Sequence, residues 1–220
     1  MDSDTVWRHI DEQRGILADM FDGIDAGRWS TPSLCDGWTV RDVAAHLTHS
    51  HMSRPRVVLE AVRSGFRFNA MIHRLAVEDT RAPAEISEAL RAMRGSRKRA
   101  PGTADCDPLL DVLVHGQDIA VPLGFDLPMP PDAAAAAAHR LWTMRFPFNP
   151  QRRLGGVELV ATDADFRVGA GRIVEAPIRD ILMLLAERLT PSDFGVAGSA
   201  ERDRLDRNHT AGSDRKPGMT

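Results

Sequence analysis

The stretch that decides the fold runs from Trp38 to Leu47 and reads WTVRDVAAHL. Thr39 suits the N-cap position of a helix and Asp42 follows three residues later, so the two side chains can form a capping box. The apolar residues of the stretch recur at helical spacing and leave His46 two turns into the helix, at the edge of its apolar face. A side chain in that position can point between the helices of a bundle.

A second stretch, DVLVH at residues 111–115, places a carboxylate and an imidazole four residues apart. In a helix capped by Asp107, opened by Pro108 and ended at Pro122, the side chains of Asp111 and His115 lie on one face. If His46 reaches the same point, the chain holds three ligands for one cation and leaves coordination positions open. That arrangement is typical of catalytic rather than structural metal sites.

Two further helices follow from apolar residues at helical spacing, one over Val6–Ile24 and one from Pro83 to about Arg94. Pro55 is expected to kink or restart the helix that carries His46, and the linker to the helix at Pro83 is long and partly helical. Four helices joined in this way predict an antiparallel four-helix bundle.

The character of the sequence changes after Gly124. An alanine-rich helix is expected from Asp132 to Trp142, and a hairpin of residues 157–161 and 165–169 follows it. Ile173 and Val174 add a third short strand, before a helix from Pro177 to about Leu189.

The predicted fold class is therefore mainly α, a four-helix bundle with a small C-terminal α+β cap. The bundle is assigned to residues 1–126 and the cap to residues 127–196. Residues 197–220 are rich in Asp, Arg, Gly and Ser and are expected to be disordered.

Composition excludes several classes of function. The 220 residues carry a formal net charge of only −3, which gives no electrostatic reason to expect a nucleic-acid partner. No apolar run is long enough to span a bilayer, and the acidic N-terminus does not read as a signal peptide. With two cysteines, Cys35 and Cys106, a disulfide scaffold is not expected and a cytoplasmic location is the prediction.

Three stretches together resemble the mycothiol-dependent maleylpyruvate isomerase family, within the DinB/YfiT-like metalloenzyme superfamily. They are WTVRDVAAHL at 38–47, DVLVHGQDI at 111–119 and ATDADFRVG at 161–169. The resemblance implies a DinB-like bundle that binds a divalent metal, usually zinc, through His46, Asp111 and His115. The family pattern has glutamate where this chain has Asp111, so either the helices lie closer together here or the carboxylate holds the metal more loosely.

The chemistry of such a site can be argued from the ligands. Zinc with three protein ligands keeps a position for water or for a thiol, and a bound thiol loses its proton well below its ordinary pKa. The resemblance implies that this thiol is mycothiol, a small cofactor, and that its thiolate adds to the double bond of maleylpyruvate before rotation and elimination. Other members of the fold transfer the thiol instead, and the sequence does not choose between isomerisation and S-transfer on a small-molecule substrate.

Several neighbouring residues have two readings. Asp118 either orients the free ring nitrogen of His115 or is a solvated residue near a helix end. His49 and His51 are expected at a pocket rim or in solvent, and Gln117 in water. Cys35 is either a soft ligand or a small buried hydrophobe.

The arginines could not be ranked. Arg167, Arg172 and Arg179 are candidates for binding an anionic substrate, while Arg41 is expected to support the helix cap.

Two other hypotheses stay open. The first is a DinB-like bundle that binds metal or ligand without turnover, suggested by Asp111 and by the lack of an identified substrate-binding arginine. The second is metal-dependent hydrolysis, which needs a general base, and only His49 or Asp118 could supply one.

Overall fold

A computed structural model describes residues 1–99, 103–145 and 148–195. The chain divides into two compact units, Met1–Arg140 and a second one from Leu141 onward. The first unit is helical and the second contains a small sheet, which confirms the mainly α class with a small α+β part. The domain boundaries at residues 126 and 196 stay predictions, and the expected disordered tail lies outside the described residues.

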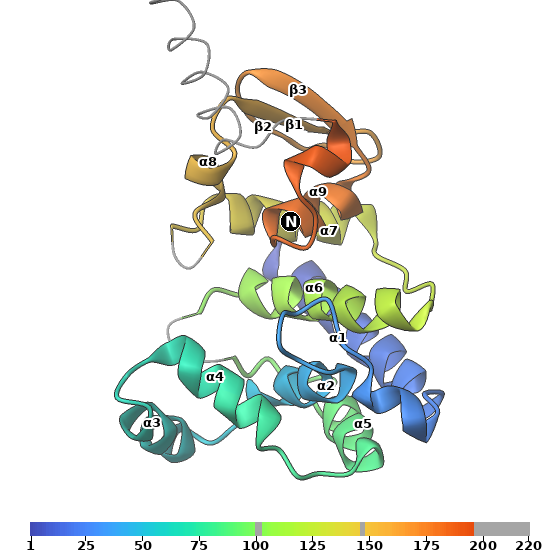
Figure 1. Cartoon of the computed structure of the whole chain (residues 1–220), viewed down its shortest axis with the longest axis vertical. Helices are drawn as coiled ribbons and strands as arrows, with labels where there is room; N and C mark the ends of the chain where they lie inside the picture. Colours follow the sequence, from blue (N-terminus) through green and yellow to red (C-terminus); the bar gives the residue numbers. More distant parts are fainter. Residues whose placement is uncertain (100–102, 146–147, 196–220) are drawn as a thin grey trace, which may run out of the picture. The chain divides into compact units, whose positions relative to one another are not determined.

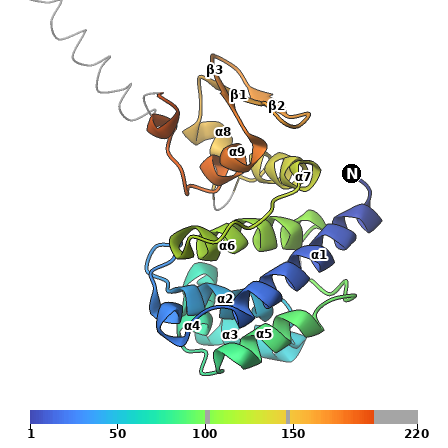
Figure 2. The same cartoon turned by 90° about the vertical axis from the view of Figure 1, so that its right-hand side faces the viewer.

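The helical unit is built around four helices, which Figures 1 and 2 show from two directions. Helix α1 packs against α5 and α6, and α2 packs against α5 and α6 as well. Apolar side chains from all four fill the interior between them, among them Leu17, Val43, Ile86, Leu90 and Leu113, each at most 1% exposed. The four helices are α1 (Ser3–Asp22), α2 (Val40–His49), α5 (Pro83–Ala92) and α6 (Cys106–Leu123).

The predicted capping box at the start of α2 is present. The backbone N–H of Thr39 donates to Oδ2 of Asp42 at 2.9 Å, and the N–H of Asp42 donates to Oγ1 of Thr39 at 3.3 Å. These reciprocal bonds satisfy two amide groups that a helix start leaves without partners. They therefore fix where α2 begins, and with it the direction in which His46 points.

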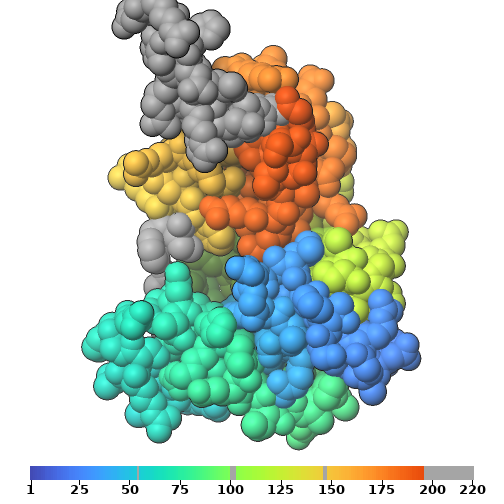
Figure 3. Space-filling view, in the orientation of Figure 1, coloured from blue at the N-terminus to red at the C-terminus, as the bar shows by residue number. Residues whose placement is uncertain are grey.

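The linker between α2 and α5 forms two helices, α3 (Arg54–Arg63) and α4 (Phe68–Val77). Pro55 restarts the chain as a new helix, because in a first turn its missing N–H costs no hydrogen bond. Helix α4 packs against α2, and residues 54–77 form part of the surface of the helical unit in Figure 3. A short 3₁₀ helix, η1 (Ala26–Ser30), follows α1 and was not predicted.

Helix α6 differs from the prediction at both ends. It begins at Cys106 rather than Pro108, and it continues through Pro122 to Leu123, before Gly124 at φ 68° ends it. Pro122 has no N–H to offer the carbonyl of Asp118 one turn earlier. The N–H of Leu34 donates to that carbonyl instead, at 3.1 Å, so the helix tolerates the proline in its last turn and gains a link to the loop before α2.

The second unit contains a three-stranded sheet in the order β2-β1-β3. The strands are β1 (Val157–Ala161), β2 (Arg167–Gly169) and β3 (Arg172–Ala176). Strand β1 pairs antiparallel with β2, which confirms the predicted hairpin, and parallel with β3. Gly171 has φ 123°, and a Cβ atom there would lie 2.3 Å from the carbonyl oxygen of Gly156, so only glycine fits the turn between β2 and β3.

Short helices complete the chain. They are α7 (Pro131–Trp142), α8 (Pro150–Arg153), α9 (Ile178–Leu185) and the 3₁₀ helix η2 (Pro191–Phe194). Helix α9 contacts β1 and ends earlier than the predicted Leu189. The guanidinium of Arg153 donates to the carbonyls of Leu184 and Leu185 at 2.9 and 3.0 Å, groups that a helix end leaves without intrahelical partners. Among the described helices, none is both long enough and apolar enough to cross a bilayer.

Candidate metal centre

The three predicted ligands come together from two helices. Oδ1 of Asp111 lies 3.5 Å from Nε2 of His46 and 3.4 Å from Nε2 of His115. The two imidazole rings have centroids 4.9 Å apart and stand nearly perpendicular, at 87°. One ligand atom from each of the three residues lies within 4.8 Å of the others, so a single cation between α2 and α6 could touch all three.

These distances suit a tetrahedral metal ion. Zinc bonds to nitrogen and oxygen are about 2.0–2.1 Å long, which puts neighbouring donor atoms of a tetrahedral site roughly 3.3 Å apart. The carboxylate of Asp111 lies close to that separation from both imidazoles, and farther than a good hydrogen bond allows. Although it is one methylene shorter than the family's glutamate, Asp111 therefore reaches both histidines.

Asp118 lies behind His115 on the same helix. Its Oδ2 is 2.8 Å from Nδ1 of His115, and its side chain is 0% exposed. A carboxylate in this position accepts a hydrogen bond from Nδ1–H, so the lone pair of Nε2 is free to point toward Asp111 and His46. Metal-binding histidines usually have such a partner on their other nitrogen, because it fixes the ring and raises its basicity.

Trp38 is part of the site, a role that was not predicted from the sequence. Its ring lies 5.2 Å from the ring of His46, edge-on, and 6.4 Å from the ring of His115, stacked at 19°. The indole is 8% exposed and is held just before the capping box of α2. The indole of Trp38 therefore limits the rotation of both imidazoles. The sequence signal that could have located it is its position two residues before the well-marked start of α2.

The histidines also set the charge of Asp111. Burial by itself would raise the pKa of this carboxyl, but His46 and His115 lower it below its ordinary value. The carboxylate form, the one that binds a cation, is therefore favoured at neutral pH.

Cys35 and Gln117 both lie near His115, and each had been assigned a position from the sequence. Sγ of Cys35 lies within 4.8 Å of ligand atoms of His115 and Asp118, so the half-buried thiol lies beside the centre. Gln117 was expected in water, which is wrong. It is 1% exposed and its Nε2 donates to the carbonyl of Leu127 at 3.0 Å, because α6 is buried on more than one face.

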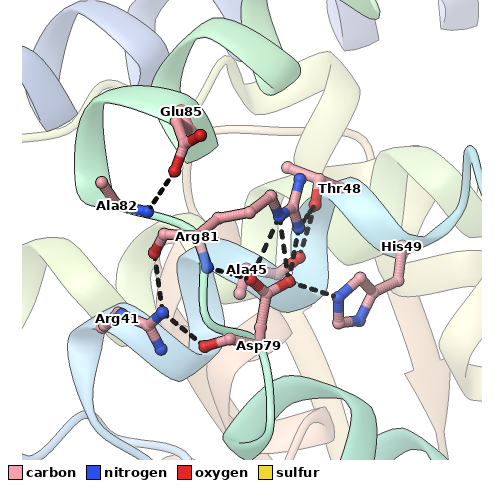
Figure 4. A network of polar contacts seen from close by, with 8 residues as sticks. All are labelled: Arg41, Ala45, Thr48, His49, Asp79, Arg81, Ala82 and Glu85. Atoms are coloured by element: carbon pink, nitrogen blue, oxygen red, sulfur yellow. Dashed lines mark hydrogen bonds and ion pairs between the residues drawn. The ribbon is translucent and has the colours of Figure 1, made fainter.

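The loop between α4 and α5 contributes a network that the sequence did not reveal, drawn in Figure 4. Nε2 of His49 lies 3.1 Å from Oδ2 of Asp79, and Arg81 donates to the same carboxylate from Nη2 at 2.6 Å. Arg41 does not support the helix cap as predicted. Its guanidinium donates to the carbonyl oxygens of Asp79 and, at 2.7 Å, of Arg81.

The neighbouring histidines are not in bulk solvent. The side chain of His49 is 13% exposed, and burial lowers its pKa although the hydrogen bond to Asp79 opposes that shift. Burial, together with the charges of Arg14 and Lys98, lowers the pKa of His51 to about 4. Both residues line a cavity, in keeping with the predicted pocket rim.

A cavity of about 250 Å³ opens beside the three candidate ligands. His46 and Asp111 form part of its wall, and most of the rest is apolar, including Phe68, Met71 and Ile72. Small-molecule sites have this character, with a few polar groups in an apolar lining.

In the second unit, the arginines flagged by the sequence lie on or beside the sheet. Nε of Arg167 donates to Oε1 of Glu158 at 2.7 Å, so this guanidinium is engaged across the strand pair. Arg172 begins β3 and Arg179 lies in α9. None of the three is thereby singled out as a substrate ligand.

Residues 10–108 match the model of the mycothiol maleylpyruvate isomerase N-terminal domain. No curated protein sequence matches the chain. Among solved structures, a mycothiol-dependent maleylpyruvate isomerase has a TM-score of 0.56 at 16% identity, and the alignment covers 91% of this chain and 94% of that one. A histidine-to-alanine variant of a mycothiol-dependent maleylpyruvate isomerase aligns over the same shares, at 16% identity and a TM-score of 0.50.

The fold and the cluster together define a helical-bundle protein with a candidate metal centre between two of its helices. Structural likeness at 16% identity establishes the fold, a DinB-like bundle with a small C-terminal cap. Residues 10–108, just under half of the chain, match the N-terminal domain model of the mycothiol maleylpyruvate isomerase family, in agreement with the family predicted from the sequence.

Proposed function

We propose that this protein is a zinc-dependent enzyme that uses mycothiol for cis-trans isomerisation or thiol S-transfer on a small substrate. His46, Asp111 and His115 are the proposed metal ligands, and Asp118 is the proposed partner of His115. The observation that carries the proposal is the pair of Nε2–Oδ1 separations of 3.5 and 3.4 Å around Asp111, contributed by two separate helices.

Bound zinc would supply the Lewis acidity that keeps a coordinated thiol in its thiolate form at neutral pH. The chain itself holds the ligands in place. Asp118 keeps His115 in the tautomer whose Nε2 is a ligand, and the indole of Trp38 packs against both imidazoles. The 250 Å³ cavity presents a mostly apolar wall beside Asp111, which suits the uncharged parts of a small organic substrate.

The match of residues 10–108 to the isomerase family model supports mycothiol as the thiol. The two cysteines, Cys35 and Cys106, lie in the described residues and form no disulfide, which suits the proposed cytoplasmic location. Isomerisation and S-transfer would both start from the same thiolate. They differ in the last step, because isomerisation releases the thiol from the product whereas S-transfer leaves it attached.

The test begins with metal content. The purified full-length protein is expected to retain one zinc per chain, and His46→Ala and His115→Ala are each expected to lose tight retention, with affinity reduced at least about a thousandfold. His139→Ala is the matched control, because His139 is an exposed histidine of the same unit and is outside both the ligand set and the rings around Trp38. A variant of His46 or His115 that keeps full zinc occupancy would remove that residue from the centre.

The reaction is tested on the zinc-loaded protein. Mycothiol is expected to bind saturably, and two assays then separate the alternatives, one following conversion of maleylpyruvate to its trans isomer and one following consumption of the thiol. Zinc binding and thiol binding with neither reaction would favour the alternative of a metal-binding bundle without turnover on these substrates. Protein that neither retains nor takes up zinc would contradict the proposal.

A further inference from the structure

A second, larger cavity adjoins the one at the candidate metal centre. It has a volume of about 600 Å³ and lies in the helical unit, between the end of α2, the α3–α4 pair and α5. Three residues line both cavities, namely His49, Met52 and Leu75. The two cavities therefore lie side by side, with His49 on the boundary between them.

The two cavities differ in chemistry. The small one is mostly apolar, whereas the large one is lined by charged side chains of both signs. Most of these charges are paired with each other. Arg74 lies 2.6 Å from Glu60 and 3.4 Å from Glu78, and Arg63 lies 3.3 Å from Glu60.

Paired charges favour a neutral polar ligand over an ion. An arginine and a glutamate that neutralise each other attract no counterion strongly, yet the guanidinium has five N–H donors and the carboxylate about four acceptor sites, so each keeps hydrogen-bonding capacity to spare. Hydroxyl groups, which both donate and accept, match such a lining. The guanidinium of Arg56 also lines this cavity, at an exposed part of its wall.

Of the three residues that the cavities share, His49 is held in place by a hydrogen bond to Asp79, which Figure 4 shows. Burial alone would raise the pKa of Asp79, but its bonds from Arg81 and His49 keep that pKa well below the ordinary range, so the group is a carboxylate. Arg81 also donates to Oγ1 of Thr48 at 2.7 Å, which ties the loop to α2. That carboxylate accepts a hydrogen bond from Nε2–H of His49.

The other nitrogen of His49 is consequently an acceptor. Nδ1 is buried and, within the described part of the chain, has no hydrogen-bond partner. Nε2 of His51, on the lining of the large cavity, is also buried without one. Buried polar atoms without partners are costly, so a ligand with hydroxyl or amide donors would be favoured in this part of the site.

We propose that the 600 Å³ cavity binds the hydroxyl-rich glycoside of the thiol cofactor, while the adjoining cavity takes its cysteinyl end beside His46 and Asp111. The inference rests on the proposed function for the choice of thiol. Mycothiol joins a cysteine through an amide to a neutral glucosamine–inositol unit, so its two ends have the chemistry of the two cavities. The volume of the large cavity is within the range of small-molecule sites.

The experiment uses full-length protein freed of metal by a chelator and calorimetric titration with three probes. The probes are mycothiol, the thiol-free glucosaminyl-inositol, and N-acetylcysteine. The thiol-free glycoside is expected to bind and to compete with mycothiol. Arg63→Ala and Glu78→Ala are each expected to weaken binding of the glycoside and of mycothiol about tenfold, the effect of losing a hydrogen bond to a charged group, and to leave N-acetylcysteine unchanged.

Matched controls come from neighbouring segments of the same unit. Arg67→Ala and Glu88→Ala remove exposed charges near α4 and in α5 that line neither cavity, so they are expected to leave all three titrations unchanged. Circular dichroism and thermal unfolding establish that each variant is folded.

Two results would overturn the inference. One is absence of glycoside binding, and the other is glycoside binding that Arg63→Ala and Glu78→Ala do not weaken. A fourth probe, maleate, tests for an anionic occupant. Maleate binding that these variants weaken while glycoside binding is unaffected would assign the cavity to the substrate instead. The inference and the proposed function can fail separately. Zinc retention without glycoside binding would contradict only the inference. Glycoside binding without zinc uptake would contradict only the proposed metal centre.

Discussion

Two histidine–carboxylate pairs lie close to His46, and they are built in different ways. His115 and Asp118 are three residues apart on α6, with Nδ1 and Oδ2 separated by 2.8 Å. His49 and Asp79 are 30 residues apart, with Nε2 and Oδ2 separated by 3.1 Å, and the carboxylate comes from a loop that Arg41 and Arg81 hold. The first pair follows from helix geometry alone, whereas the second exists only once the whole unit has folded.

The difference implies a division of labour. A pair inside one helix adds little to tertiary structure but sets the orientation of a single ring. A pair joining a helix to a distant loop ties two parts of the unit together, and its loss is expected to lower the free energy of unfolding. Substituting each carboxylate in turn tests the comparison.

The largest effect is expected for Asp79→Ala. The side chain of Asp79 is 8% exposed, and its removal leaves the guanidinium of Arg81 and the imidazole of His49 without their shared partner. We expect the free energy of unfolding to fall by about 3 kcal/mol in urea titrations, while zinc affinity stays within about twofold. Asp79→Asn, which keeps one acceptor oxygen, should lose less. A loss below about 1 kcal/mol for the alanine variant would show that the network is not a structural tie.

A smaller effect, and the opposite pattern, is expected for Asp118→Asn. The amide cannot hold His115 in the ligand tautomer as a carboxylate does, so zinc affinity should fall about 10- to 100-fold in competition with a chromophoric chelator. Stability of the metal-free protein should change less than in Asp79→Ala. Unchanged zinc affinity would mean that Asp118 has no part in the centre.

The smallest effect is expected for Asp111→Glu, which installs the residue of the family pattern. Because Oδ1 of Asp111 already lies 3.4–3.5 Å from both imidazole nitrogens, the longer side chain must fold back to reach the same point. We expect zinc affinity to fall by less than about tenfold, measured by the same competition. Tighter binding in the glutamate variant would contradict this and mark Asp111 as a compromise.

What could be predicted from the sequence was local. The capping box of Thr39 and Asp42, the one-turn spacings of Asp111, His115 and Asp118, and the apolar faces of the helices depend only on residues a few positions apart. Such patterns fix which side chains share a face of a helix. They predicted the bundle and placed the three candidate ligands on two helices.

What could not be predicted depends on contacts between distant segments. Asp79 and Arg81 lie in a loop without any periodic pattern, and nothing in their local sequence indicates that Arg41 and His49 lie beside them. The burial of Gln117 and the packing of Trp38 on two imidazoles likewise arise from tertiary structure.

Pro122 has a consequence that reaches beyond helix α6. By lacking an N–H it leaves the backbone oxygen of Asp118 available, and the amide of Leu34 occupies it. A substitution to alanine would create a rival donor within the helix and loosen the segment that leads into Trp38. A substitution at Pro122 is therefore expected to change how freely the imidazoles of His46 and His115 rotate, although the three candidate ligands stay the same.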